Sequence, residues 1–400
     1  MDLTENDHLT SIVSHVLNIE DITTGTSDSK YLLRYRGHLY GDPMKAFDTI
    51  SQKLRPLDIT PMFRREAEQH IVFLIAGVVK PRPSNPLINL ILFVLTVLSM
   101  IFAGALYSYQ GPMPSSTAEL LYTVLYSLPS GIPFAISLSA ILLAHEFGHY
   151  LAGRFHRVHV TLPYFLPFPL SPFGTMGAFI QLKEPPKNKR ELLDIGISGP
   201  IAGFLVAIPV LLIGLSMSEL SLIVLHPGQG VQLEGNSILY LLAKYIVFGK
   251  LLPAPIDYGN IHPLLYWVRY FFTSQPLPVG GIDVFIHPVA WAGWAGLLVT
   301  ALNLIPAGQL DGGHVIHTLI GKKAKLLLPF ILIILILLGF SWSGWWLWAG
   351  IIFFLGRVYA EPLDQITSLD PKRKILAIVG LLIFVLVFTP VPLIQTIVGG

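Results

Sequence analysis

The stretch SLSAILLAHEFGHYLAGRF, residues 137–155, poses the central problem of this sequence. Its first half is apolar, like a helix that crosses a bilayer. Its second half carries His145, Glu146 and His149. Ionisable side chains at membrane depth are costly, and where they occur they usually mark a functional site. The rest of the chain shows whether this stretch belongs in a membrane.

The composition predicts an integral membrane protein. Hydrophobic residues make up 53% of the 400 residues, charged residues only 12%, and the mean hydropathy is +0.64. Soluble globular domains carry about 25% charged residues. The net charge of +2 is small and dispersed, so we expect no nucleic-acid partner. The absence of cysteine excludes disulfides, thiolate metal sites and a cysteine nucleophile. The polar first 30 residues predict no cleaved signal peptide.

Residues 1–80 predict a small cytoplasmic α+β domain. Residues 30–40 alternate like a strand, and residues 42–54 have helical spacing with Asp42 as N-cap. Residues 59–79 read as two strands joined by a polar turn. The proline-rich segment 81–86 follows as a linker.

The remaining chain predicts a polytopic α-helical membrane protein with about seven transmembrane segments, because a span needs about 20 apolar residues. The segments are 87–109, 131–153, 196–217, 288–305, 325–341, 344–358 and 374–396. The fifth and sixth are short and close together, which predicts a tight hairpin. The resulting parts are a first transmembrane helix with an outer loop (87–130), a three-helix core (131–320) with an extracytoplasmic insertion (218–288), and C-terminal transmembrane helices (321–400).

The distribution of basic residues predicts the orientation. If the N-terminus is cytoplasmic and seven segments alternate, 23 of the 26 Lys and Arg residues fall on the cytoplasmic side. The outer segments then hold only Lys244, Lys250 and Arg269. The N-terminus is therefore expected in the cytoplasm and residues 218–288 outside.

His145 and His149 are four residues apart and therefore share one helix face. This spacing lets two imidazoles bind one Zn²⁺, with Glu146 beside them as general base. Zinc lowers the pKa of bound water to about 7, and the carboxylate takes the proton as water attacks a carbonyl. The alternative is a structural polar cluster, which is disfavoured at membrane depth. We expect one zinc per chain, with His149 roughly 8 Å and His145 roughly 13 Å from the cytoplasmic end of the helix.

The third ligand is expected in LNLIPAGQLDGGH, residues 302–314, because catalytic zinc commonly takes three protein ligands. Asp311 is the best candidate. Pro306 and Gly308 break the helix before it, and broken backbone at this depth is tolerated only against protein or a wet cavity. Asn303 could donate a hydrogen bond to a substrate carbonyl or oxyanion.

Other roles are open for these residues. Asp311 alone could simply cap the short helix that follows it. His314 and His317 are rival third ligands. His156 and His159 are expected at the membrane interface.

These motifs together resemble the site-2 protease family of intramembrane zinc metalloproteases, peptidase family M50. The family pairs HExxH on one span with N-x-x-P-x-x-x-L-D-G on a later one, found here at 145–149 and 303–312. SGPIAGF (198–204) resembles its Gly-Pro helix, and FGTMGAFI (173–180) resembles its membrane-embedded hairpin. With its N-terminal domain, the chain is similar to the branch shared by bacteria, archaea and chloroplasts. The expected location is a prokaryotic cell membrane.

The resemblance implies a metalloendopeptidase that cuts transmembrane protein substrates in or near their membrane helices, within the lipid bilayer. Helical peptide bonds are shielded, so a substrate must unwind, and an edge strand at 175–181 could hold it by strand addition. Gly174, Thr175 and Gly177 are therefore candidate substrate-binding residues, although the glycines alone could simply form a turn. We find no PDZ-like module, and no feature of the sequence defines the oligomeric state.

Two other functions compete with proteolysis. A proteolytically inactive scaffold that binds membrane helices would be expected to lack Glu146 or a ligand, yet Glu146 and Asp311 are both present. A metal transporter would distribute polar residues along several spans. Segments 87–109, 196–217 and 325–341 carry no charge apart from Lys325 at the rim of the last.

Overall fold

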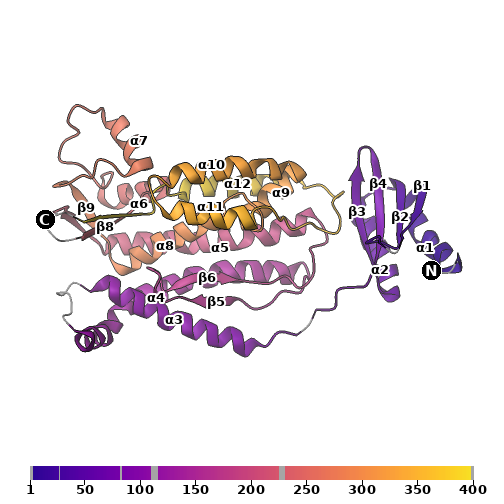
Figure 1. Ribbon diagram of the computed structural model, residues 1–400, viewed down its shortest axis with the longest axis horizontal. Helices are drawn as coiled ribbons and strands as arrows, with labels where there is room; N and C mark the ends of the chain where they lie inside the picture. Colours follow the sequence, from indigo (N-terminus) through magenta and orange to yellow (C-terminus); the bar gives the residue numbers. More distant parts are fainter. Residues whose placement is uncertain (1–2, 27, 82, 110–115, 225–229, 398–400) are drawn as a thin grey trace.

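The computed structural model describes residues 3–26, 28–81, 83–109, 116–224 and 230–397. The molecule is elongated and mostly helical (Figure 1). An N-terminal domain with a four-stranded sheet lies at one end of a helical bundle, here called the domain end. The last strand of the chain lies at the opposite end, here called the far end (Figure 1).

The N-terminal domain combines two helices with a sheet. Its elements are α1 (Leu3–Ser14), β1 (Leu17–Thr24), β2 (Leu33–Leu39), α2 (Pro43–Leu54), the 3-10 turn η1 (Arg55–Leu57), β3 (Ile59–Glu66) and β4 (Gln69–Ala76). Within the described residues the strands form an antiparallel sheet in the order β1-β2-β4-β3. The predicted cap of α2 is confirmed, because the Asp42 carboxylate accepts hydrogen bonds from the backbone N–H groups of Met44 and Lys45. The predicted strands are also confirmed, whereas α1 and β1 were not predicted.

In the part of the chain that the structure describes, three helices are long and apolar enough to cross a membrane. They are α3 (Pro86–Ser108), α4 (Thr117–Phe155) and α5 (Lys189–Ser216). The predicted outer loop is wrong in part, because α4 begins at Thr117 and residues 117–130 are helical. Pro129 and Pro133 lie inside α4. Prolines are tolerated in membrane helices, where neighbouring groups satisfy the freed carbonyls.

The remaining helices are shorter. They are α6 (Ile238–Phe248), α7 (Pro263–Thr273), α8 (Pro288–Asn303), α9 (Asp311–Ile320), α10 (Leu328–Leu338), α11 (Gly344–Leu355) and α12 (Pro371–Val387), with the 3-10 segment η2 (Gly321–Leu327) before α10. The end of the last predicted span is wrong: α12 stops at Val387, and residues 393–397 form β10 (Leu393–Ile397). Pro390 and Pro392 explain the stop, because proline cannot continue the helical hydrogen-bond ladder.

Helices α4, α5 and α8 form the centre of the bundle and share one apolar core. Glycines let α5 and α8 approach closely. A Cβ on Gly293 of α8 would lie 2.6 Å from Leu211 Cα of α5, so only glycine fits this crossing. Small residues at helix contacts are the usual means of close packing in membranes.

Beside this core runs a two-stranded hairpin of β5 (Tyr164–Pro167) and β6 (Thr175–Phe179). β5 packs along α3, and β6 contacts both α3 and α4. The hairpin therefore lies beside α3 and α4, the helix that carries the two histidines.

The far end is built from the segment between α5 and α8 together with the last strand. It contains β7 (Glu219–Leu222), β8 (Gly230–Glu234), α6, α7 and β9 (Ile282–Phe285). β7 pairs with β9, and β8 pairs with β10. A buried charge cluster lies here: Lys244 Nζ is 3.2 Å from Glu234 Oε1 and 3.5 Å from Asp283 Oδ1.

At the domain end, the connection between α11 and α12 joins the N-terminal domain to the bundle. The Phe63 N–H of β3 donates to Leu363 O (2.9 Å), and the Gln365 N–H donates back to Phe63 O (3.1 Å). On the other side, the Asp364 N–H donates to Lys187 O (2.6 Å), just before α5. Residues 363–365 thus act as an additional strand between the edge of the domain sheet and the start of α5.

Candidate metal centre

Helix α4 places His145, Glu146 and His149 inside the bundle, where each is less than 7% exposed. The i, i+4 spacing directs both imidazoles to one side of the helix. His149 Nδ1 lies 2.7 Å from the carbonyl oxygen of Ile195 on α5. A carbonyl only accepts, so Nδ1 carries a proton, and in the neutral ring Nε2 presents a lone pair. Such an outer hydrogen bond is typical of metal-binding histidines.

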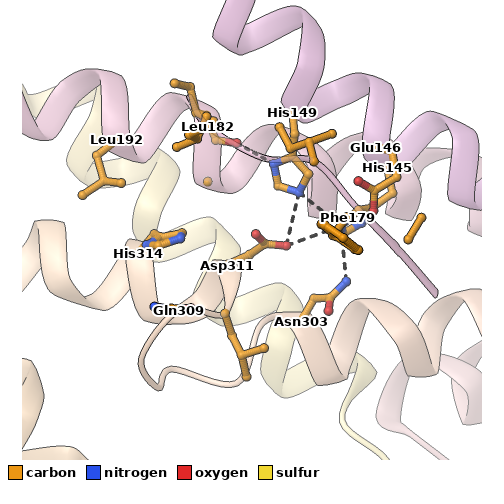
Figure 2. Close-up of a pocket in the computed structure, with 15 residues that line it drawn as sticks. His145, Glu146, His149, Phe179, Leu182, Leu192, Asn303, Gln309, Asp311 and His314 are labelled. Carbon is orange, nitrogen blue, oxygen red and sulfur yellow. Dashed lines mark hydrogen bonds and ion pairs between the residues drawn. The ribbon is translucent and has the colours of Figure 1, made fainter. Parts of the chain in front are cut away.

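The broken segment after α8 brings Asp311 to the two histidines (Figure 2). α8 ends at Asn303, Gly308 turns the chain with φ of +54°, and α9 begins at Asp311. Asp311 Oδ2 lies 3.4 Å from His145 Nε2 and 3.3 Å from His149 Nε2. Leu310 is the N-cap of α9, and within the described residues no side chain caps this helix. The structure therefore gives Asp311 contacts to the histidines and no capping bond.

The spacing of these donor atoms fits a tetrahedral zinc ion. Zinc bonds of 2.0–2.1 Å at tetrahedral angles place the ligand atoms about 3.3 Å apart. The third distance, between His145 Nε2 and His149 Nε2, is 3.2 Å. A metal cation between the three atoms would be attracted by the carboxylate oxygen and by the lone pairs of neutral imidazoles. Among the described residues, His145, His149 and Asp311 are the group that could hold a metal ion.

Glu146 and Asn303 lie next to the three donors. Glu146 Oε2 is buried and has no hydrogen-bond partner among the described residues. Asn303 Nδ2 lies 3.3 Å from His145 Nε2. Both line a cavity of about 240 Å³ that also contains the three donors. A carboxylate without a partner beside room for water is suited to accept a proton.

The hairpin lies beside the cavity, but its lining residues differ from those predicted to bind substrate. The cavity is lined by residues 178–180 and Leu182. Gly174 (φ +71°) instead packs on α3, where the Ser99 hydroxyl donates to its carbonyl (2.6 Å). Thr175 and Gly177 lie within β6, where the Gly177 N–H donates to Thr175 Oγ1 (2.9 Å). A substrate role for Gly174, Thr175 and Gly177 stays a prediction.

The other histidines take separate places. His314 lines the cavity, and within the described residues its Nδ1 has no partner. His317 stacks on Tyr359, with ring centroids 5.3 Å apart. His156 pairs with Asp194 (2.9 Å) and His159 with Glu184 (2.8 Å). Neither rival third ligand belongs to the group of three metal-spaced donors.

Two glycines of α5 lie opposite the two histidines of α4. The sequence analysis did not predict their role. A Cβ on Gly199 would overlap the His149 imidazole, and one on Gly203 would lie 3.1 Å from His145 Cβ. On α4, a Cβ on Gly148 would lie 2.6 Å from Ser198 O. The two helices thus cross closely with room left only for the imidazoles. The pattern that could have indicated this close crossing is the pair of glycines four residues apart in an apolar helix.

Comparison with known proteins identifies the class. The model of peptidase family M50 matches residues 133–339, and the chain belongs to this family. A similar relative is the probable zinc metalloprotease EGY1, chloroplastic, of Arabidopsis thaliana, which is 29% identical over 323 residues, covering 76% of this chain and 53% of the relative. The protein of the same name from Oryza sativa subsp. japonica is 29% identical over 76% of this chain and 50% of its own length. The probable zinc metalloprotease EGY2, chloroplastic, of Arabidopsis thaliana is 28% identical over 90% of this chain and 60% of its own length.

The resemblance to the site-2 protease family is therefore confirmed. No solved structure matches the chain. The chain spans about half to three-fifths of the length of these curated relatives. Because their names place them in chloroplasts, they lend no support to the predicted prokaryotic membrane.

Proposed function

We propose that the protein is an intramembrane zinc metalloprotease that hydrolyses peptide bonds in or near the transmembrane helices of membrane proteins, as in regulated intramembrane proteolysis. One observation carries the proposal: His145, His149 and Asp311 present three donor atoms at the spacing of a tetrahedral site, beside the buried carboxylate of Glu146. Membership of peptidase family M50 and the names of the relatives support it. We propose one zinc per chain.

The mechanism follows from the positions of the side chains. Zinc, when bound, would act as a Lewis acid that lowers the pKa of water and polarises the scissile carbonyl. The Ile195 carbonyl keeps His149 in the tautomer that presents Nε2. Glu146 accepts the proton of the attacking water and returns it to the leaving amine. Asn303 Nδ2 donates to the carbonyl oxygen as it gains negative charge.

We propose that the substrate binds as an extended segment beside β6. β5 pairs with one edge of β6, and within the described residues no strand pairs with the other edge. An open edge can take an additional strand from an unwound substrate. The end of β6 and the chain just after it line the cavity through residues 178–180 and Leu182, so a segment held there would pass Glu146.

We further propose seven crossings, with residues 1–80 in the cytoplasm and 218–288 outside. The contacts of the α10–α11 hairpin support this map. At its base, the Tyr359 hydroxyl donates to Ala324 O (3.2 Å). At its tip, Trp345 Nε1 donates to Pro390 O (2.6 Å), just beyond α12. The two short helices would therefore cross together with the segments that flank them. The other domain limits and the prokaryotic location stay predictions.

The substitution Glu146→Gln tests the proposed function. The amide cannot accept the proton of water, while both histidines and Asp311 remain. We expect the variant to keep its zinc, measured by elemental analysis, and to lose cleavage of a model transmembrane substrate by at least about 10²-fold. As a control, His149→Ala should lose both zinc and cleavage. Full activity in Glu146→Gln would remove Glu146 from the mechanism.

A further inference from the structure

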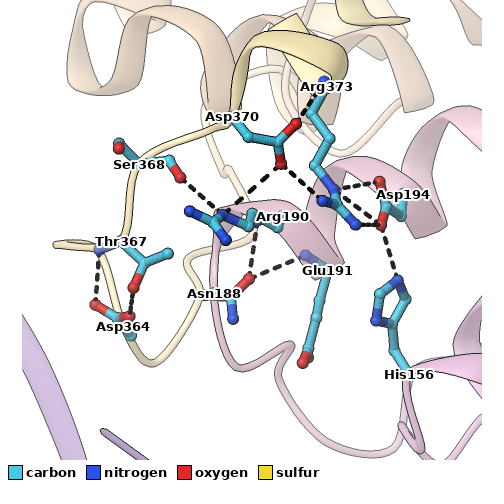
Figure 3. Close-up of polar contacts among 10 residues, drawn as sticks. All are labelled: His156, Asn188, Arg190, Glu191, Asp194, Asp364, Thr367, Ser368, Asp370 and Arg373. Carbon is cyan, nitrogen blue, oxygen red and sulfur yellow. Dashed lines mark hydrogen bonds and ion pairs between the residues drawn. The ribbon is translucent and has the colours of Figure 1, made fainter. Parts of the chain in front are cut away.

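A polar network at the domain end joins α4, α5 and α12 through one carboxylate, Asp194 (Figure 3). Arg373, in the first turn of α12, donates from Nε to Asp194 Oδ1 (2.9 Å) and from Nη2 to Oδ2 (2.6 Å). His156, the C-cap of α4, places Nε2 2.9 Å from the same Oδ2. Paired parallel bonds between a guanidinium and a carboxylate fix both distance and orientation. The ends of three helices are therefore held at one point.

A second carboxylate, that of Asp370, also binds the Arg373 guanidinium. Asp370 caps α12 by accepting from the Arg373 backbone N–H (3.1 Å), and its other oxygen accepts from Arg373 Nη1 (2.7 Å). The carboxylate of Asp370 thus directs the side chain toward α5. Because Asp370 already fixes the Arg373 guanidinium, little conformational entropy is lost when the guanidinium also pairs with Asp194.

The network is one residue away from the metal centre. Asp194 directly precedes Ile195, whose carbonyl accepts the His149 Nδ1 proton (2.7 Å). His156 follows His149 by about two helical turns on α4. α4 and α5 are therefore linked at two successive levels, by His149 with Ile195 inside the bundle and by His156 with Asp194 at its end. Because a Cβ on Gly199 would overlap His149, a shift of α5 along α4 would disturb the imidazole directly.

We propose that Arg373 is a positioning residue for the metal centre: it holds Asp194, and with it the start of α5, so that the Ile195 carbonyl fixes the His149 imidazole. The inference rests on the proposed function, since it takes His149 as a ligand. Arg373 lies beyond the residues matched by the family model, 133–339. It gives α12 a role that the sequence left open.

The test compares Arg373→Gln with the matched control Lys374→Gln in the whole 400-residue chain. Lys374 is the next residue of α12 and carries the same charge, but its side chain is exposed. Zinc affinity is measured by competition with a chelator, and kcat and KM with a model transmembrane substrate. We expect Arg373→Gln to lose about tenfold in zinc affinity and in kcat, with KM within about twofold, as for other supports behind metal ligands. Lys374→Gln should match the wild type.

Asp194→Asn completes a double-mutant cycle. Because Arg373 acts through Asp194, the double variant should lose no more zinc affinity than the worse single variant. Arg373→Lys keeps the charge but not the fork, so it should recover part of the loss. If Arg373→Gln does not fold, Arg373→Lys and Asp194→Asn still report zinc affinity. Wild-type affinity in these variants, or losses that multiply in the double variant, would refute the inference.

The same measurements separate this inference from the proposed function. If wild type and His149→Ala bind zinc equally, the metal site itself is wrong. If His149→Ala loses zinc while Arg373→Gln binds it like the wild type, only the positioning role of Arg373 fails.

Discussion

The sequence leaves two roles for Asp311, ligand or cap; the structure gives it no capping bond, and one substitution separates the two roles by experiment. Asn and Asp cap helices about equally well, so Asp311→Asn should be harmless to a cap. A neutral amide is a poor zinc ligand, so the same change should greatly reduce zinc content and abolish cleavage if Asp311 binds the metal. Asp311→Glu keeps the charge and should retain part of the binding. Elemental analysis and substrate cleavage provide the readouts, and near-normal values for Asp311→Asn would redirect attention to His314.

Zinc binding is expected to be as sensitive to substitution of Gly199 as to substitution of the proposed ligands. A Cβ at this position would overlap the His149 imidazole, so Gly199→Ala must displace the ring and should lower zinc affinity by at least about tenfold. Gly350→Ala is the matched control, because nothing lies within 4 Å of a Cβ there and alanine favours helix. Chelator competition on both variants provides the measurement. Unchanged zinc affinity in Gly199→Ala would contradict this prediction and would show that α5 can move away from α4 at this crossing.

At the scale of elements, the buried charges between β8, α6 and β9 predict a dependence of stability on pH. Burial raises the pKa of Asp283 from 3.8 to about 6, an effect that Lys244 partly offsets and Glu234 increases. The folded state therefore binds this proton more tightly than the unfolded state, so the contribution of Asp283 to stability rises as the pH falls from 7 through 6 toward 4. Asp283→Asn should remove this contribution.

The measurement is the difference in Tm between wild type and Asp283→Asn across pH 4.5 to 7.5. The difference should shift in favour of the wild type as the pH falls through about 6. Groups remote from Asp283 cancel in this comparison, whereas Lys244 and Glu234 interact with Asp283 and contribute to the difference. A difference that stays constant with pH would exclude a raised pKa for Asp283.

The elements that the sequence predicts well are those set by local composition. The apolar runs of α3 and α5, the cap at Asp42 and the turn before Asp311 each follow from neighbouring residues. The approach of Asp311 to the histidines was expected from the helix break at Pro306 and Gly308 and from the need of catalytic zinc for a third ligand, and the family resemblance agrees with it. Contacts such as residues 363–365 with β3, or β8 with β10, join segments far apart in the sequence. No local pattern encodes such a pairing, so the structure was needed to find it.

At the scale of the whole molecule, the proposed orientation can be tested by labelling, because the chain has no native cysteine. Asp257→Cys lies in an exposed part of the far end, and Lys322→Cys in an exposed part of η2. In intact cells, a membrane-impermeant thiol reagent should modify the first and spare the second. Both should react after the membrane is permeabilised. The reverse pattern in intact cells would invert the topology.

The pairing of β8 with β10 also bears on how the molecule is assembled during synthesis. Residues 230–234 receive their partner strand from residues 393–397, so every helix from α6 to α12 is made before the pair can close. Pairing across such a long sequence separation is slow, because the loop-closure entropy must be overcome first. Until then, β8 presents an unpaired edge, the kind of surface that recruits other chains. A ribosome stalled before residue 393 would therefore leave a nearly complete bundle whose far end carries an unpaired strand edge. Such an edge can bind other chains and would make the protein a target for quality-control proteases.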